Sequence, residues 1–138
     1  MIVLYLLETH GMDPNGAPGS EHTPLGLAAS HGFKQVVRTL LHFKADLKLA
    51  DTDRRTPLHL AAKAGKAEVA AILLQHKREH AQTPTAIIEA PDSLRFTPLH
   101  LAVSEGNVEI CRLLIDNGAN LQASNTSLKT PLHLAVAN

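Results

Sequence analysis

The sequence is short of aromatic residues, cysteine and net charge, and each shortage excludes something. Aromatics make up 3% of its 138 residues, with no tryptophan. A core built on large rings is therefore excluded, and thin elements packed through aliphatic side chains are favoured. A single cysteine, Cys111, rules out an intrachain disulfide and fits a reducing compartment. Thirteen basic residues balance thirteen acidic ones, so there is no basic surface typical of nucleic-acid or membrane-surface binders.

Long hydrophobic runs are also missing. No apolar stretch approaches the roughly 20 residues needed to cross a bilayer. Residues 2–7 are apolar, but they lack a basic flank and fall short of the roughly 7–15 residues of a secretory signal. We interpret them as part of a helix and expect one domain, without membrane insertion, in the cytoplasm or nucleus.

A Thr-Pro-Leu triplet recurs along the chain, beginning at Thr23, Thr56, Thr97 and Thr130. The spacings of 33, 41 and 33 residues give a period of 33 with one insertion of eight. Three copies read TPLHLA, whereas the first has Gly26 in place of the histidine. A fixed period of this length predicts a repeat architecture.

Each part of this motif suits the start of a short helix. Threonine is a preferred N-cap, and proline fits the first helical position. The histidines at the third position can reach back to the threonine, as the glutamate of a capping box does. A glycine nine residues after the threonine permits the left-handed turn that ends a helix of about two turns. These residues are His59, His100 and His133, and Gly32, Gly65 and Gly106.

A second helix is predicted after each glycine, because apolar residues recur there at i, i+1, i+4 and i+5. They are Val36, Val37, Leu40 and Leu41; Val69, Ala70, Leu73 and Leu74; and Ile110, Cys111, Leu114 and Ile115. Two short helices cannot bury such a stripe alone. The helix pairs must therefore stack on their neighbours.

These features together resemble the ankyrin repeat family: the TPLHLA box, the glycine, the paired aliphatics and a terminal Gly118-Ala119 recur in register. The resemblance implies an all-α solenoid of stacked helix-turn-helix units with projecting turns. It also implies a concave face, lined by the turns and the first helices, that binds a protein.

The resemblance divides the chain into full and partial repeats. Full repeats are expected at 19–51, 52–92 (with an insertion near 75–91) and 93–125, and partial ones at 1–18 and 126–138. Leu132, Leu134 and Val136 are expected to lack a cover. The chain is then a fragment of a longer array or, alternatively, one molecule's last helix docks on another's first, head to tail.

The insertion lies between Leu74 and Asp92. Its first half favours helix and is expected to lengthen the second helix by a turn, whereas Pro84 and Pro91 prevent regular helix throughout. Ile87 and Ile88 are expected to fold back over the helix ends. The alternative is a loop whose two isoleucines engage a partner.

The turn tips depart from the family pattern. Two residues before each threonine the family usually has a glycine with positive φ, whereas this chain has Glu21, Arg54, Arg95 and Leu128. A side chain there costs of order 1 kcal/mol. We therefore expect another type of turn at these tips.

The nine histidines do not predict a metal site. His59, His100 and His133 start different helices, and packed helices lie about 8–10 Å apart, too far for bonds of about 2.0–2.1 Å to one zinc ion. His76 and His80 are spaced i,i+4 but lack an obvious third ligand. A helix-start hydrogen bond is the favoured role for the recurring histidines.

Catalytic residues and cofactor sites are not predicted either. Cys111 occupies the core position of Val37, which favours an inert thiol. Asp51, Asp53 and Asp92 lie in turns, where aspartate caps backbone N–H groups. No paired carboxylates, triad spacing or phosphate-binding loop stands out, so we expect no cofactor and no enzymatic activity.

The resemblance places partner contacts at the turn tips and near the ends of the first helices. The predicted partner-binding residues are His22, His31, Asp53, Arg55, Lys63, Leu94, Arg95, Phe96, Glu105 and Lys129. Buried aromatics and arginines dominate interface energies, so Phe96, Arg55 and Arg95 are expected to form a hot spot. The alternative is that Phe96 packs sideways on Leu94 or the insertion.

The sequence thus predicts a non-catalytic module that binds a protein partner on its concave face, as a monomer with head-to-tail association possible. Two alternatives are a regulatory or targeting segment of a larger enzyme and a head-to-tail assembly element. A metal- or pH-sensing binder would require stoichiometric zinc.

Overall fold

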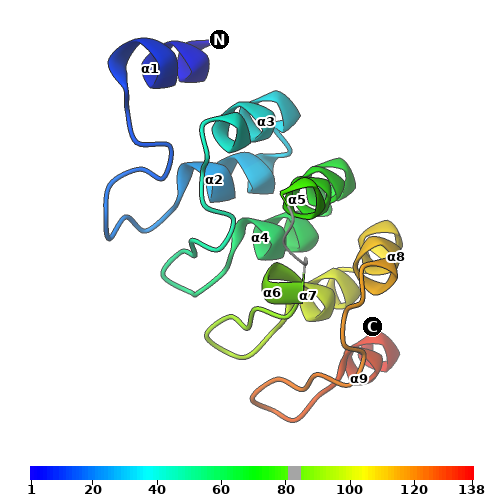
Figure 1. Ribbon diagram of the computed structural model, residues 1–138. Helices are drawn as coiled ribbons and strands as arrows, with labels where there is room; N and C mark the ends of the chain where they lie inside the picture. Colours follow the sequence, from blue (N-terminus) through cyan, green and yellow to red (C-terminus); the bar gives the residue numbers. More distant parts are fainter. Residues whose placement is uncertain (81–84) are drawn as a thin grey trace.

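The structure is a stack of helix pairs. The computed structural model describes residues 1–80 and 85–138, and these contain helices but no strand. Helices α2, α4, α7 and α9 form one row, α1, α3, α5 and α8 form a second, and the turns project to one side (Figure 1). The expected all-α solenoid is confirmed. The helices are α1 (Ile2–His10), α2 (Pro24–His31), α3 (Lys34–His42), α4 (Pro57–Ala64), α5 (Ala67–Glu79), α6 (Thr85–Ile88), α7 (Pro98–Ser104), α8 (Val108–Asp116) and α9 (Pro131–Ala137).

The first helix of each pair begins as the motif predicts. At α4 the Thr56 N–H donates to His59 Nδ1 at 3.2 Å, and Thr56 Oγ1 lies 2.9 Å from the same nitrogen. The same capping box opens α7 and α9. At α2, where glycine replaces histidine, Thr23 Oγ1 accepts a bond from the Gly26 N–H at 2.9 Å. The threonine cap therefore forms with or without the histidine.

The glycines end the first helices as predicted. Gly32, Gly65 and Gly106 have φ of 72°, 71° and 73°, a region that side chains disfavour. Beside Gly65, a Cβ atom would lie 3.1 Å from Asn107 Oδ1 of the next pair. Asn107 Nδ2 also donates to the Ala62 carbonyl at 2.8 Å, so this turn joins two neighbouring pairs.

The second helices supply the aliphatic core. Their predicted stripes are buried at Val37, Leu40 and Leu41, at Val69, Ala70, Leu73 and Leu74, and at Ile110 and Leu114. Each such leucine or isoleucine contributes about 1.5–3 kcal/mol by leaving water. Cys111 is half-buried at the edge of this core. None of the described helices is long and apolar enough to cross a membrane.

The insertion lengthens α5 and returns to the core. Helix α5 has 13 residues, against nine in α3 and α8. The short α6 then buries Ile87 and Ile88, each 1% exposed. Ile88 precedes Asp92 by four residues, as the buried Leu47 precedes Asp51. The expectation that the isoleucines fold back is confirmed, whereas Pro84 lies outside the described residues.

Candidate functional site

Three successive turns between the helix pairs share one hydrogen-bond pattern. In the first, Asp51 Oδ1 accepts bonds from the N–H groups of Asp53 and Arg55, both at 2.9 Å. In the second, Asp92 Oδ1 accepts from Leu94 and Phe96 at 2.9 and 2.8 Å. Each aspartate thus organises its own turn, as the sequence predicts for this residue type.

The third turn uses asparagine in the same way. Asn125 Oδ1 accepts from the N–H groups of Ser127 and Lys129 at 2.9 and 3.0 Å. Each of the three capping residues is the first residue of its turn, and Asp92 and Asn125 are buried. An amide oxygen therefore replaces the carboxylate without changing the turn.

The expectation of another turn type is wrong at three tips. Arg54, Arg95 and Leu128 have φ of 60°, 60° and 59°, so they occupy the glycine conformation despite their side chains. The side-chain caps hold the turns in this shape against a cost of order 1 kcal/mol per residue. Glu21 does differ, since the positive φ values of its turn fall on Gly16 and Gly19.

Neighbouring turns are also bonded to each other. The Ser93 N–H donates to the Asp53 carbonyl at 2.9 Å, and the Thr126 N–H donates to the Leu94 carbonyl at 3.1 Å. The tips therefore form one continuous edge along the side of the stack (Figure 1). We call this edge, made of residues 51–55, 92–96 and 125–129, the turn ridge.

Arg55 is held within the turn ridge by an ion pair. Its Nε lies 3.3 Å from Asp92 Oδ2, and the two side chains are 21% and 1% exposed. Asp92 uses its other oxygen to cap its own turn. Arg55 therefore joins two turns, which leaves little of it for a partner.

Phe96 lies against the core and the His100 ring, rather than standing free at the tip. The ring is half-buried against the core and contacts the His100 ring edge to face, with centroids 5.7 Å apart. Leu94, two residues away, is 55% exposed, and Arg95 is exposed at the tip. The structure does not bring Phe96, Arg55 and Arg95 together as one exposed cluster.

The buried histidines make a second bond that the sequence did not predict. Because the Thr56 N–H donates to His59 Nδ1, the neutral ring carries its proton on Nε2. That Nε2–H donates to the Phe96 carbonyl of the next turn at 2.9 Å. His100 repeats the arrangement towards the Lys129 carbonyl at 3.2 Å. Each of these histidines thus joins a helix start to the following turn.

Burial keeps these two histidines neutral. Desolvation lowers the pKa of His59 below the usual 6.5, and the bond to the Phe96 carbonyl opposes it only in part. Desolvation likewise lowers the pKa of His100, against the bond to the Lys129 carbonyl. Neither ring has a nitrogen left for a metal ion, which agrees with the helix-start role inferred from the sequence.

The remaining predicted contact residues lie exposed near the first helices. His31 ends α2 and stacks on Phe33 with ring centroids 5.3 Å apart. Lys63 lies in the last turn of α4, and Glu105 follows α7. His22 precedes Thr23, and its Nε2 lies 3.8 Å from Glu21 Oε1.

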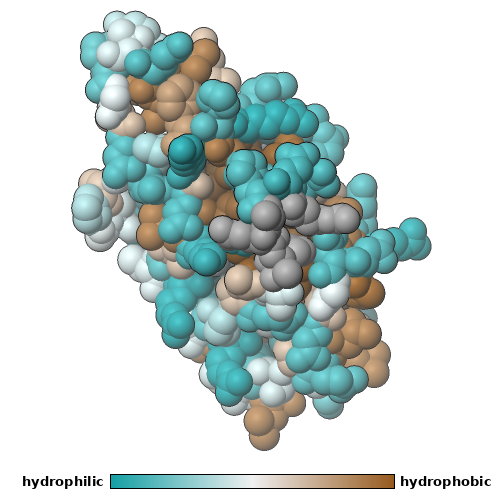
Figure 2. All heavy atoms as spheres, in the orientation of Figure 1, coloured by the Kyte–Doolittle hydropathy of each residue, from teal (hydrophilic) through white to brown (hydrophobic). Residues whose placement is uncertain are grey.

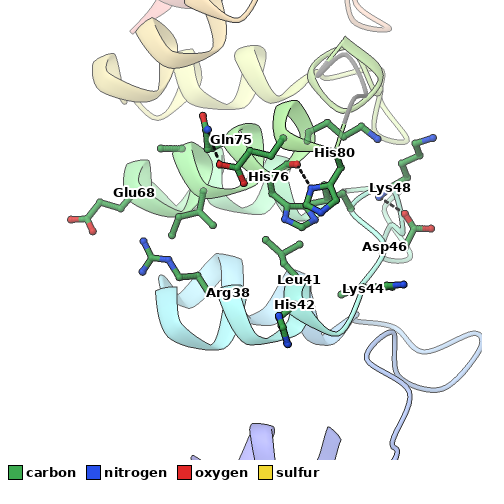
Figure 3. Close-up of a pocket in the computed structure, with 16 residues that line it drawn as sticks. Arg38, Leu41, His42, Lys44, Asp46, Lys48, Glu68, Gln75, His76 and His80 are labelled. Carbon is green, nitrogen blue, oxygen red and sulfur yellow. Dashed lines mark hydrogen bonds between the residues drawn. The ribbon is translucent and has the colours of Figure 1, made fainter. Parts of the chain in front are cut away.

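A cleft of about 1170 Å³ that sequence reasoning missed is lined by α3, α5 and the turn at residues 44–48. His76 and His80 lie together on the α5 side, with Leu41 opposite (Figure 3); their ring centroids are 4.1 Å apart. Burial and then the charge of His80 lower the pKa of His76. The cleft mixes basic residues with Glu68 and Glu79, so no ligand of one charge is indicated.

The described residues offer no cluster suited to a metal ion. Within residues 1–80 and 85–138, no three His, Cys, Asp or Glu side chains could hold one ion. Burial raises the pKa of the Cys111 thiol, which disfavours the reactive thiolate.

The comparisons with known proteins agree with the fold. A family model of ankyrin repeats in three copies matches residues 1–86 and again residues 85–138. Curated proteins give no match. The family match spans the chain, and the capped turns, helix pairs and TPLHLA helix starts supply the structural features behind it. The chain belongs to the ankyrin repeat family.

Proposed function

We propose that the turn ridge, with the adjoining ends of the first helices, binds a partner protein. Ankyrin repeats are generally protein–protein interaction modules, and this chain belongs to that family. The observation that carries the proposal is the rigidity of the ridge. Three turns share one conformation, two backbone bonds join them, and binding therefore costs little ordering entropy.

The side chains at the tips indicate the chemistry of the partner. Leu94 and Leu128 are 55% and 80% exposed, and Arg54 and Arg95 are exposed beside them. Figure 2 shows hydrophobic surface at the tip of the last turn. Apolar anchors next to arginines fit a partner segment that carries apolar and acidic residues.

The ten predicted contact residues divide into two groups under this proposal. Eight are exposed and are proposed to touch the partner: His22, His31, Asp53, Lys63, Leu94, Arg95, Glu105 and Lys129. Arg55 and Phe96 are proposed to hold the ridge in shape instead, because one is paired with Asp92 and the other packs on the core. Leu128 is added as a contact.

The test is affinity capture with a ridge variant and a matched control. The double variant Leu94→Ser and Arg95→Glu removes the apolar anchor and reverses a charge, whereas Arg112→Glu reverses an exposed charge on α8, away from the turns. Quantitative mass spectrometry should show proteins retained by the wild type and the control but lost with the double variant. Capture that is unchanged in all three would contradict the proposal.

We also propose that the module has no chemistry of its own and acts inside cells. The ankyrin fold is typically non-catalytic, and family members are commonly intracellular. The raised pKa of the Cys111 thiol and the neutral, fully bonded His59 and His100 support a structural role for the groups that catalysis would need.

A further inference from the structure

The tips of the turn ridge present the same side-chain position three times. Arg54, Arg95 and Leu128 each occupy the fourth place of their turn, with φ of 60°, 60° and 59°. All three side chains are exposed. Arg95 is exposed although a bonded turn lies on each side of its own, so the exposure follows from the place at the tip. The ridge therefore carries two cationic positions followed by an apolar one, in a row.

The hydrogen bonds of the ridge set the spacing of this row. Within the middle turn, the Asp92 N–H donates to the Phe96 carbonyl at 2.9 Å, and the Ser93 N–H donates to the Asp53 carbonyl of the preceding turn at 2.9 Å. Backbone segments paired in this way lie about 4.8 Å apart. One step along the ridge contains two such spacings, one within a turn and one between turns, which gives about 9–10 Å per turn. Packed helices, at about 8–10 Å, advance by the same step.

The ridge offers side chains to a partner rather than free backbone donors. Each N–H group of residues 92–96 and 125–129 already donates a hydrogen bond, either to the side chain that caps its turn or to a backbone carbonyl. An added β-strand pairs with a row of unpaired N–H and C=O groups. A partner strand therefore cannot extend the ridge by full backbone pairing, and the partner must be recognised through the tip side chains.

A segment in the polyproline II conformation matches this row. It has three residues per turn and rises about 3.1 Å per residue, so residues i, i+3 and i+6 lie on one face, about 9.3 Å apart. Its backbone remains in water, which suits a surface without free donors. In a β-strand, residues three apart point to opposite faces. An α-helix would need residues i, i+7 and i+14 to span the three tips, and ordering about fifteen residues costs more entropy than ordering about seven.

The charges at the tips indicate the side chains of that segment. Arg54, Arg95 and Lys129 are exposed, and within the ridge, all of which the structure describes, Asp53 is the one exposed acid. The exposed charge of the ridge is therefore net positive. Carboxylates at i and i+3 would pair with the two arginines, and an apolar side chain at i+6 would pack on Leu128.

We propose that the turn ridge binds a segment in the polyproline II conformation that carries acidic residues at i and i+3 and an apolar residue at i+6. The carboxylates pair with Arg54 and Arg95, and the apolar side chain packs on Leu128. This inference rests on the proposed function of the ridge and adds the conformation and the residue spacing of the partner. Because exposed ion pairs contribute little individually and are screened by salt, a single segment binds weakly and its affinity falls as salt is added.

The test is fluorescence anisotropy of labelled synthetic peptides titrated with the whole chain. The probe is Asp-Pro-Pro-Asp-Pro-Pro-Leu, prepared also in reversed order because the row does not fix the direction of the partner. The control Asp-Asp-Pro-Pro-Pro-Pro-Leu keeps the composition but changes the spacing of the carboxylates. One order of the probe should bind about two- to fivefold more tightly than the control, which pairs with one arginine only. A helical peptide with Asp at i and i+7 and Leu at i+14 represents the α-helical alternative.

Variants of the protein test which side chains are used. Arg54→Gln and Arg95→Gln should each weaken binding of the probe by about two- to fivefold, and Leu128→Ser should also weaken it. The matched control Arg112→Gln, at an exposed arginine of α8, should leave binding unchanged. Circular dichroism melting checks that every variant is folded.

The proposal is overturned by a control or helical peptide that binds as tightly as the probe, by ridge variants that bind the probe as the wild type does, or by a probe that does not bind at millimolar concentration. The capture test distinguishes such a failure from a failure of the proposed function. If the double variant of that test still loses its captured proteins, the ridge binds a partner of another shape.

Discussion

Identical sequence behaves differently in the middle of the stack and at its end. The segment TPLHLAV opens both α7 and α9. In α7, Leu99 and His100 are 2% and 0% exposed, whereas in α9 Leu132 is 72% exposed and His133 is also exposed. The same residues are core in one place and surface in the other because, among the described residues, α7 has helices on both sides and α9 packs on α7 alone.

The hydrogen bonds at the start of the helix are the same in both places. The Thr-His capping box forms at α9 as it does at α7, with Oγ1 to Nδ1 distances of 2.8 and 2.9 Å. Within the part of the chain that the structure describes, the bond from Nε2 to the following turn forms at α4 and α7 but not at α9. Helix starts are therefore encoded within one repeat, whereas burial and the histidine link require the next one, as in other nearest-neighbour stacks.

The largest difference should come from truncating the shared leucine. Leu99→Ala should lower the free energy of unfolding by about 2–5 kcal/mol, because it leaves a cavity in the core. Leu132→Ala should change it by about 0.5 kcal/mol or less, because that side chain is already in water. Urea denaturation of dilute samples measures both. Equal losses at the two sites would break the comparison.

Substitutions at Asp92 distinguish the contribution of turn capping to stability from that of ion pairing. Asp92→Ala should cost about 1–3 kcal/mol, because it leaves two backbone N–H groups and Arg55 without their acceptor. Asp92→Asn should cost less, since Asn125 shows that an amide oxygen caps the same turn. The matched change Asn125→Ala removes a cap but no ion pair. Denaturation midpoints should rank Asp92→Ala as the least stable; a loss from Asp92→Asn as large as that from Asp92→Ala would show that the cap contributes nothing.

Lowering the pH should reduce the free energy of unfolding through the interior histidines. Burial lowers the pKa of His59 and His100 in the fold, so below about pH 6.5 the unfolded chain binds more protons and stability falls as the pH falls. Above that pH their contribution is fully present. Each histidine adds at most about 1.4 kcal/mol per pH unit. Unfolding free energies between pH 7.5 and 5.5 should have a smaller slope in His59→Gln than in the wild type, and a slope that stays the same would contradict this prediction.

The smallest effect should come from the tips. Arg95→Gly should stabilise by up to about 1 kcal/mol, because φ is 60° there and glycine removes the strain of that conformation. Gly106→Ala, at φ 73° with open space around it, should destabilise by a similar amount. Melting temperatures that move the other way would contradict the assigned turn.

The sequence predicts most of the stack because its signals are local. The threonine caps, the glycine stops and the second-helix stripes each depend on residues close together in the sequence. The caps and stops are confirmed, and so are the stripes except at Ile115, which is 44% exposed. The return of Ile87 and Ile88 to the core was also predictable, since two adjacent isoleucines are costly to leave in water.

The features that the sequence did not predict are contacts between residues of neighbouring repeats. The His59 and Phe96 link joins residues 37 apart, which spacing alone does not place in contact. The tips were mispredicted because steric preference was considered without the cap at Asp92 or Asn125. The role of Arg55 was missed for a related reason, since its partner Asp92 lies one repeat further on.

Hydrogen–deuterium exchange of the dilute chain tests most directly whether neighbours supply the stability. Amides of α4, α5 and α7, which have helices on both sides, should exchange slowest and together. Those of α9 should exchange much faster than those of α7, although the two helices share their sequence. Equal protection of α7 and α9 in the monomer would contradict the account.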